Sequence, residues 1–517
     1  MRVRAVAALA LASAGIGAAP ACAADCAALA GLQVGDVRVD HATHIPPSSA
    51  GWAPETTSFY KPVPVHVPLC RVEGRIEGNI GFELWLPDAD AWNGRLLGAG
   101  VGGDAGIFNY TDMSQRLAQG FATVTTDSGH KASQPRWMSN AKARVDYEHR
   151  AVHLTALAAK TLIGRYYSAP LGHSYFLGCS GGGRQALKEL QDYPLDYDGI
   201  VAGAPGPYMP LISVRMMWFS LMQKHNPAGA LSDADWTLYE RATISACDRL
   251  DGVKDGIMED PRACRFRPRT LLCHPGQTGN CLTAPKLAML EAIIAPMRDE
   301  WGEAMDKGLL PGVRTRPGPP SPLLRAMWAD AVHDDPNWDE NGFQRTRDLA
   351  LSNQVMPELR ADSVAIAPFI GRGGKAIIYQ GWQDPSVIAG PTVDYYRRLA
   401  AAHGGPTQLG KSVRLFMVPG MYHCANGPGA DSFGGSGHAN ASLDAARDTL
   451  WAVIDWVEKG RLPERIEAEK RRGDVRLFTR ALCAFPARAR YTGGDPDLAS
   501  SFVCREPPLH AGRLRRD

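Results

Sequence analysis

Hydrophobic residues along the chain fall into short apolar runs that alternate with segments of helical spacing. Runs typical of strands occupy residues 82–86, 95–98, 121–126 and 175–179. Residues 149–167 repeat apolar positions at helical spacing and lead directly into the last of these runs. Strands that alternate with helices are typical of a mainly parallel sheet covered on both faces. The pattern therefore predicts an α/β fold.

The alternation is interrupted once. Residues 205–372 lack it and hold two short cysteine loops and the proline-rich stretch 311–322. It resumes with a strand pattern at 376–379, a helical pattern at 392–402 and a strand pattern at 413–418. We therefore expect residues 205–372 to be one insertion between two parts of a single α/β domain, residues 25–204 and 373–517.

The first 24 residues have the pattern of an export signal. Arg2 and Arg4 precede an apolar run over residues 5–19, and small residues at 21–24 suit cleavage. The run is too short to span a bilayer comfortably. Lipid attachment at Cys22 is an alternative, although the residues before it match a lipoprotein signal poorly. We expect a secreted or periplasmic protein with residues 1–24 as its signal peptide.

Composition narrows the function classes. The chain has 517 residues, 45% of them hydrophobic, which is enough for a large core. Its formal net charge is +2, with basic and acidic residues interleaved. Nothing in this balance favours a nucleic acid or an anionic membrane as partner, and we expect neither.

The cysteines suit an exported chain. Of 11 cysteines, ten remain if Cys22 is removed with the signal. Most lie near one another in the sequence, and two flank the candidate catalytic residues described below. Spacing does not determine connectivity, but one pairing leaves no free thiol: Cys26 with Cys70, Cys247 with Cys264, Cys273 with Cys281, Cys483 with Cys504, and Cys179 with Cys424.

The strongest chemical signal is the sequence GCSGGGRQ at residues 178–185. A strand pattern ends there in Gly-x-Ser-x-Gly, and helix-forming residues follow. This order is typical of a nucleophile elbow, in which glycines allow the tight turn that exposes the serine hydroxyl. Ser180 is therefore the candidate nucleophile, and a disulfide between Cys179 and Cys424 could tie its loop to that of a histidine.

A serine nucleophile requires a histidine base and a carboxylate that orients it. Asp384 follows the strand at 376–379, and His423 follows the strand at 413–418. The order Ser, Asp, His is that of α/β-hydrolases, and open parallel sheets place their sites beyond the carboxyl ends of strands. For the oxyanion hole we expect the N–H groups of Gly181 and of Gly102, with Gly103 as the next candidate.

A third cluster lies within the insertion. Residues 247–257 read CDRLDGVKDGI, with three aspartates separated by glycines. Such a loop suits a hard cation such as calcium, which prefers oxygen ligands. The alternative, a solvated Asp-Gly turn, is equally compatible with this composition.

Four motifs identify the chain as similar to the tannase and feruloyl esterase family, a group that also includes the terephthalate-monoester hydrolase MHETase. They are GCSGGGRQ at 178–185, DGIVAGAP at 198–205, GWQDP at 381–385 and PGMYHC at 419–424. The resemblance covers essentially the whole chain after the leader. It implies an α/β-hydrolase fold with a large inserted lid domain.

The resemblance also implies the site and the reaction. Ser180, Asp384 and His423 would form the triad, with the Cys179–Cys424 disulfide joining its loops. The lid would hold structural Ca²⁺, with no organic cofactor, and the small-molecule substrates would be galloyl, feruloyl or related phenolic esters cleaved through an acyl-enzyme. The implied calcium ligands are Asp248, Asp251, Val253, Asp255 and Ile257. Gly181, where many members carry a larger residue, and Ala425-Asn426 depart from the family pattern beside the acyl pocket.

The sequence does not separate gallate, ferulate and terephthalate half-esters as substrates, whereas functions other than ester hydrolysis fit less well. A terephthalate half-ester would require a lid arginine aimed at the pocket, and Arg325, Arg345 and Arg347 are available. A non-catalytic binding protein on this fold would be expected to lack the serine or the histidine. A peptidase with the same triad is expected to carry a propeller or cap that nothing here resembles. The leading hypothesis is an exported aromatic-ester hydrolase.

Overall fold

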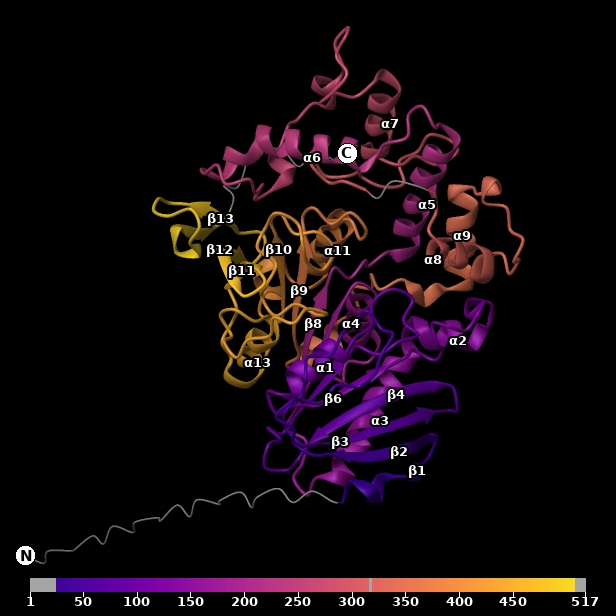
Figure 1. Cartoon of the computed structure of the whole chain (residues 1–517), viewed down its shortest axis with the longest axis vertical. Coiled ribbons are helices and arrows are strands. Elements are labelled where there is room, and N and C mark those ends of the chain that lie inside the picture. The colour runs from indigo at the N-terminus through magenta and orange to yellow at the C-terminus, as the bar shows by residue number, and fades with distance from the viewer. Residues whose placement is uncertain (1–24, 316–318, 507–517) are drawn as a thin grey trace, which may run out of the picture.

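A ten-stranded sheet forms the centre of the computed structural model, which describes residues 25–315 and 319–506 (Figure 1). The expected signal peptide, residues 1–24, lies outside the described residues. The strand order is β1-β2-β3-β4-β6-β5-β7-β8-β9-β10. These strands are β1 (Gln33–Val34), β2 (Val37–Ile45), β3 (Leu69–Ile76), β4 (Ile80–Pro87), β5 (Arg95–Ala99), β6 (Ala122–Thr126), β7 (His173–Cys179), β8 (Gly199–Gly203), β9 (Lys375–Gly381) and β10 (Val413–Val418).

The sheet has an antiparallel and a parallel part. Strands β1 to β4 pair antiparallel, and β4 also pairs antiparallel with β6. From β6 through β5, β7, β8 and β9 to β10 every pairing is parallel. The strands expected from apolar runs therefore occur. The sheet is mixed rather than mainly parallel, because the strands that precede β6 add four antiparallel pairings to the five parallel ones. The carboxyl ends of the parallel strands meet at one edge of the sheet, which positions the loops that follow them.

Helices cover both faces of the parallel part (Figure 1). Ile200 of β8 packs in the cluster that contains Leu187 of α4, whereas the next residue, Val201, packs with Val453 of α13. Successive residues of a strand point to opposite faces, so α4 and α13 lie on opposite sides. The helices of this domain are α1 (Tyr110–Leu117), α2 (Ala141–Val145), α3 (Ala151–Tyr166), α4 (Gly181–Asp192), α11 (Ala389–Ala402), α12 (Pro406–Leu409) and α13 (Thr449–Lys459).

The insertion between β8 and β9 is helical in its described residues. Its helices are α5 (Met209–His225), α6 (Asp233–Cys247), α7 (Ala284–Ile294), α8 (Pro322–Ala326), α9 (Arg345–Val355) and α10 (Ala367–Gly371). Most of its buried apolar side chains fall into two clusters. The cluster with Trp236 is formed by the insertion alone, whereas the cluster with Trp328 also includes hydrolase-domain residues such as Val101 and Trp137. Phe369 of α10, in contrast, packs in the sheet cluster. The end of range 205–372 therefore joins the hydrolase core.

Two hairpins extend the carboxyl-terminal part. Strand β11 (Arg465–Arg472) pairs with β12 (Val475–Cys483), and β13 (Arg488–Tyr491) pairs with β14 (Phe502–Arg505). Both lie beside the inserted helices (Figure 1). In the described parts of the chain, no helix is long and apolar enough to cross a membrane.

Substitutions at two glycines test the close packing of α4 against the sheet. A Cβ on Gly183 of α4 would lie 2.0 Å from the carbonyl oxygen of Gly203, whereas one on Gly164 of α3 would meet no atom within 4 Å. We expect Gly183→Ala to lower the free energy of unfolding by about 3 kcal/mol or more, because backbone must move. Gly164→Ala should raise it by about 0.5–1 kcal/mol, because alanine favours a helix. Urea unfolding measures both, and equal effects would contradict this packing.

Candidate functional site

Ser180 occupies the sharp turn between β7 and α4. Its backbone has φ 62° and ψ −123°, a conformation that residues with a side chain rarely adopt. The turn is possible because the surrounding backbone segments touch: a Cβ on Gly178 would lie 2.4 Å from the carbonyl oxygen of Gly182. The glycines of the motif therefore allow a strained turn that presents the serine hydroxyl.

His423 lies on the loop after β10 and contacts Ser180 and Asp384. Its Nε2 is 2.8 Å from Ser180 Oγ, and its Nδ1 is 2.8 Å from Asp384 Oδ2. A carboxylate oxygen only accepts, so Nδ1 carries the proton and Nε2 is free to accept from the serine hydroxyl. The structure brings together the three residues selected from the sequence.

Asp384 is held firmly in the loop after β9. Its side chain is fully buried, and Oδ1 accepts the N–H groups of Ser386 and Val387 at 2.9 and 2.8 Å. Gln380 Nε2 donates to Oδ2 at 3.1 Å, and Thr392 in turn donates to Gln380 Oε1. Sequence analysis did not select Gln380, because a glutamine inside a strand carries no motif.

The histidine loop is fixed on both sides. The Cys179–Cys424 disulfide joins it to the residue before Ser180, with the two Cα atoms 6.0 Å apart. On the other side, Tyr422 Oη donates to Glu240 Oε1 of α6 at 2.6 Å. The lid thus contacts the residue next to His423. The other four disulfides join the pairs Cys26–Cys70, Cys247–Cys264, Cys273–Cys281 and Cys483–Cys504.

The Ser180 hydroxyl faces a cavity of about 670 Å³ between the sheet edge and the lid. Its walls are largely apolar and rich in methionine, a polarizable side chain that packs well against aromatic rings. Aromatic rings are therefore well matched to this space. The apolar lining residues are Phe59, Met138, Met209, Met216, Leu323, Leu324, Met327, Met356, Leu359 and Val387.

The arginines that were considered as partners for a substrate carboxylate already bind other groups of the protein. Arg184 is the one arginine among the described residues that line the cavity, and it donates to the carbonyl oxygens of Tyr147 and Glu148. None of the three lid arginines proposed from the sequence lines the cavity. Each pairs with a lid carboxylate: Arg325 with Glu340, Arg345 with Glu300 and Arg347 with Asp348.

Four aromatic residues of the lid belong to its core. Trp328 is fully buried and Phe219 and Trp338 nearly so, and Trp218 packs against the same clusters. None of the four is among the lining residues of the cavity. They support the lid rather than contact its contents.

The two glycines expected at the oxyanion hole differ in their hydrogen bonds. Among the described residues, the N–H of Gly181 has no acceptor, which leaves it available. The N–H of Gly102 instead donates to Tyr60 Oη at 2.8 Å. Gly103, the next candidate, adjoins Gly181: a Cβ on Gly181 would lie 2.7 Å from the Gly103 carbonyl oxygen. Sequence analysis did not select Tyr60, which lies in a loop without a motif.

The aspartate loop follows α6 and begins with the 3₁₀ turn η4 (Asp248–Asp251). Asp248 accepts the N–H groups of Asp255 and Gly256, and Asp255 pairs with Arg480 at 2.5 Å. Burial, reinforced by the charges of Asp255 and Asp248, raises the pKa of Asp251 to about 6. Within residues 25–315 and 319–506, no three metal-binding side chains converge on one point.

His130, in the loop after β6, has a structural role. Its ring stacks on Trp137 with centroids 3.5 Å apart, and Nε2 lies 2.7 Å from the carbonyl oxygen of Asp104. Burial lowers its pKa to about 4, so the ring stays neutral.

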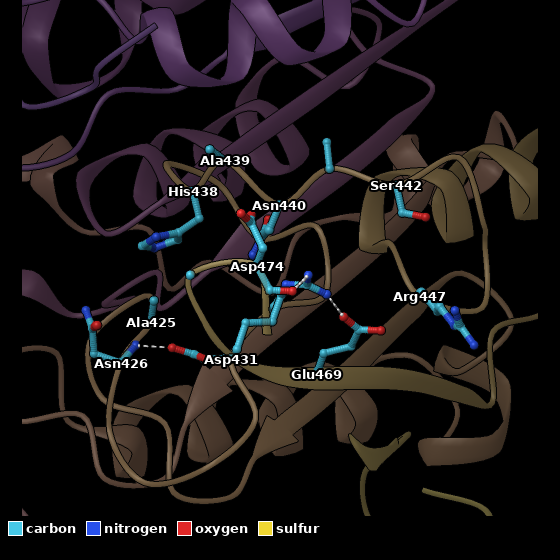
Figure 2. A pocket seen from close by; sticks show the side chains of 14 residues that line it. Ala425, Asn426, Asp431, His438, Ala439, Asn440, Ser442, Arg447, Glu469 and Asp474 are labelled. Carbon is cyan, nitrogen blue, oxygen red and sulfur yellow. Dashed lines mark hydrogen bonds and ion pairs between the residues drawn. The ribbon is translucent and has the colours of Figure 1, made fainter. Parts of the chain in front are cut away.

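Figure 2 shows a second cavity, lined in part by Ala425 and Asn426 of the loop after β10. Its volume is about 550 Å³. Its walls are polar, and these charged side chains have partners. Asp431 accepts the backbone N–H of Asn426, and Arg471 pairs with Glu469 at 2.7 Å. His438 lines both this cavity and the one beside Ser180. Among the described residues that line this second cavity, no serine hydroxyl contacts a histidine ring, in contrast to the Ser180–His423 contact in the first.

The disulfide beside the relay should affect both stability and reactivity. Replacing Cys179 and Cys424 by alanine opens a loop of 245 residues, worth about 5 kcal/mol in the chain-entropy model. We expect a lower melting temperature and at least tenfold slower labelling of Ser180 by a fluorophosphonate, because the histidine loop is released. The matched control is Cys26→Ala with Cys70→Ala, which removes a disulfide with a separation of 44 residues outside the cavity. Equal labelling rates for both double variants would contradict a positioning role.

Comparisons with known proteins identify the family. The family model "Tannase and feruloyl esterase" matches residues 64–313 and 323–505. An uncharacterised esterase of Xanthomonas campestris pv. campestris is 33% identical, over 94% of this chain and 92% of its own. A probable feruloyl esterase B of Aspergillus clavatus is also 33% identical, over 83% and 85%.

Solved structures give the same result. Feruloyl esterase B from Aspergillus oryzae superposes with a TM-score of 0.85 at 29% identity, covering 92% of this chain and 98% of that one. The tannin acyl hydrolase of Aspergillus niger superposes with a TM-score of 0.74 at 20% identity, over 92% of each chain, which shows the shared fold. The predicted α/β-hydrolase fold is confirmed. The chain belongs to the tannase and feruloyl esterase family and is a carboxylic ester hydrolase.

Proposed function

We propose that the protein cleaves esters of neutral aromatic acids through an acyl-enzyme on Ser180. The observation that carries this proposal is the Ser180–His423–Asp384 relay, with both contacts at 2.8 Å, opening into a methionine-lined cavity. The relatives named feruloyl esterase support the aromatic acyl class. The identity of the substrate is inferred from the residues that line the cavity and not from the fold, because one fold serves many functions.

In the proposed mechanism each residue of the relay has one role. As Ser180 Oγ bonds to the ester carbonyl carbon, His423 Nε2 takes the hydroxyl proton, and the carbonyl oxygen becomes an oxyanion beside the N–H of Gly181. The carbon–oxygen bond to the alcohol then breaks, and His423 returns the proton to the leaving alkoxide. Water repeats the sequence on the acyl-serine and releases the acid. Asp384 stabilises the imidazolium in both halves.

The charged groups that line the cavity distinguish between the candidate substrates. A terephthalate half-ester carries a free carboxylate, which would need an unpaired cation in a site otherwise apolar. Among the described lining residues Arg184 is the only arginine, and its two terminal nitrogens donate to carbonyl oxygens. We therefore favour neutral feruloyl- or galloyl-type esters over half-esters.

Turnover of an ester panel tests the proposal. We expect kcat/KM for methyl ferulate or methyl gallate to exceed that for mono-hydroxyethyl terephthalate at least about tenfold, since an unpaired buried charge costs more than 1.4 kcal/mol. Ser180→Ala should lower kcat at least about 10⁴-fold, and mass spectrometry should find the acyl group on Ser180 in the wild type.

Ser363→Ala, at an exposed loop serine, is the matched control and should retain full activity. Wild-type rates unchanged by Ser180→Ala would contradict the mechanism. A half-ester preferred over both neutral esters would contradict only the substrate class.

We further propose export of the protein by the signal at residues 1–24. Five disulfides support this, because such bonds persist in oxidising compartments.

We also propose that the aspartate loop of the lid holds calcium. The donors are oxygens only, which suits Ca²⁺, and burial, together with the charges of Asp255 and Asp248, raises the pKa of Asp251 in this half-buried loop. Asp248, Asp251 and Asp255, whose carboxylates do not converge on one point without the ion, would supply carboxylate oxygens, and Val253 and Ile257 would supply carbonyl oxygens. Calcium would neutralise the charge of these carboxylates and offset the cost of burying them. It takes no part in the ester chemistry.

Removal of calcium should change both stability and its pH dependence. The folded pKa of Asp251, about 6, lies above its ordinary value of 3.8, so the folded state binds the proton more tightly. Without metal, stability should therefore fall as pH rises from about 4 through 6. Because Ca²⁺ favours the charged carboxylates, millimolar Ca²⁺ should raise the melting temperature of EDTA-treated protein by several degrees at pH 7.5 and by less at pH 5.

Asp251→Asn should abolish this calcium response, whereas Asp90→Asn, at an exposed site, should retain it. Identical melting curves with and without Ca²⁺ at pH 7.5 would contradict the assignment.

A further inference from the structure

Tyr60 brings a buried hydroxyl to the mouth of the nucleophile elbow. Its side chain lines the same cavity as Ser180, Gly181 and His423, and it is only 6% exposed. Its ring packs against the loop that carries Gly437: a Cβ on that glycine would lie 3.0 Å from the tyrosine ring. The hydroxyl is therefore held in place by packing.

The hydrogen bonds of this hydroxyl are incomplete. Tyr60 Oη accepts the N–H of Gly102 at 2.8 Å, which occupies the oxygen and leaves the proton to be donated. Among the described residues no acceptor receives that proton. Tyr147, which lines the same cavity, differs, because its hydroxyl donates to the Gly103 carbonyl oxygen at 3.1 Å. A buried tyrosine hydroxyl without an acceptor is uncommon, since such groups usually find a partner.

The position of the hydroxyl suits the reacting carbonyl. A Cβ built on Gly102 would lie 2.9 Å from Tyr60 Oη and 3.6 Å from Ser180 Cβ. The tyrosine hydroxyl and the serine side chain therefore flank the same point of the backbone, on the side where the N–H of Gly102 was expected to act. That N–H points at Tyr60 instead of at the cavity.

The chemistry of the hydroxyl suits an oxyanion. Burial raises the pKa of Tyr60 above its ordinary value, so the group stays protonated at neutral pH. A hydroxyl that already accepts an N–H becomes a stronger donor, because hydrogen bonds in a chain polarise one another. The order Gly102 N–H, Tyr60 O–H, oxyanion is such a chain.

We infer that Tyr60 is a further catalytic residue, whose hydroxyl donates to the oxyanion of the tetrahedral intermediates, with Gly102 acting through it. The inference rests on the proposed serine esterase function. In this arrangement the oxyanion hole combines one backbone donor, Gly181, with one side-chain donor.

Tyr60→Phe tests the inference, because it removes the hydroxyl and keeps the ring. Loss of one oxyanion-hole donor typically lowers kcat about 10²- to 10³-fold. With methyl ferulate we expect a fall of this size in kcat, with KM changed less than about threefold. The affinity for an aryl boronic acid, whose tetrahedral adduct with Ser180 mimics the oxyanion, should fall at least about tenfold. If the Tyr60 hydroxyl had only a structural role, its removal would leave the affinity for the boronic acid unchanged.

Tyr167→Phe is the matched control. Tyr167 is a buried tyrosine outside the cavity, and its hydroxyl donates to the Pro87 carbonyl oxygen. We expect this variant to lower the melting temperature but to keep kcat and boronate affinity.

The outcomes separate the two proposals. A Tyr60→Phe enzyme with kcat and boronate affinity within twofold of the wild type would overturn the inference. This holds also if the N–H of Gly102, freed from Tyr60, then donates to the oxyanion in its place. If instead Ser180→Ala retained wild-type hydrolysis, the proposed function itself would fail.

Discussion

The site depends on backbone segments that touch where side chains are absent. Ser180 keeps a positive φ because β7, the first turn of α4 and the loop after β5 pack without a Cβ between them. A Cβ on Gly182, for example, would lie 2.9 Å from the carbonyl carbon of Gly100. This close approach aims the hydroxyl, exposes the N–H of Gly181 and brings the Gly102 loop beside it. The strain of the turn is therefore offset by the packing of the whole sheet edge.

The remaining parts of the relay are held by contacts of different kinds. Asp384 is fixed by backbone N–H groups and by Gln380, whereas His423 is fixed through its neighbours. Cys424 ties its loop covalently to the elbow, and Tyr422 hydrogen-bonds to Glu240 of the lid. The lid therefore contacts the histidine loop as well as forming the roof of the cavity. A change in lid position would be felt at the imidazole through Tyr422, a contact that no linear motif revealed.

The sequence alone predicted those features that depend on residues close to one another in the chain. The strand, turn and helix around Ser180 depend on adjacent residues, and the chain order of Asp384 and His423 follows from strand ends, so each was found at the expected place. Tyr60, Gln380 and the methionines of the cavity were not predicted, because they converge from separate segments and carry no motif. The arginines of the lid were also ambiguous in sequence, because their pairing with Glu340, Glu300 and Asp348 is determined only by packing.

The lid is anchored to the hydrolase core from the side opposite the cavity. Arg480 of β12 and Asp255 of the aspartate loop are both nearly buried and pair with each other, and Glu259 accepts the N–H of Ala489 in β13. Breaking a buried pair by removing one partner is costly, because the other charge is left uncompensated. The carboxyl-terminal hairpins therefore act as a fixed base for the loop. Since α6 joins that loop to Glu240, one rigid connection runs from the hairpins to the loop of His423.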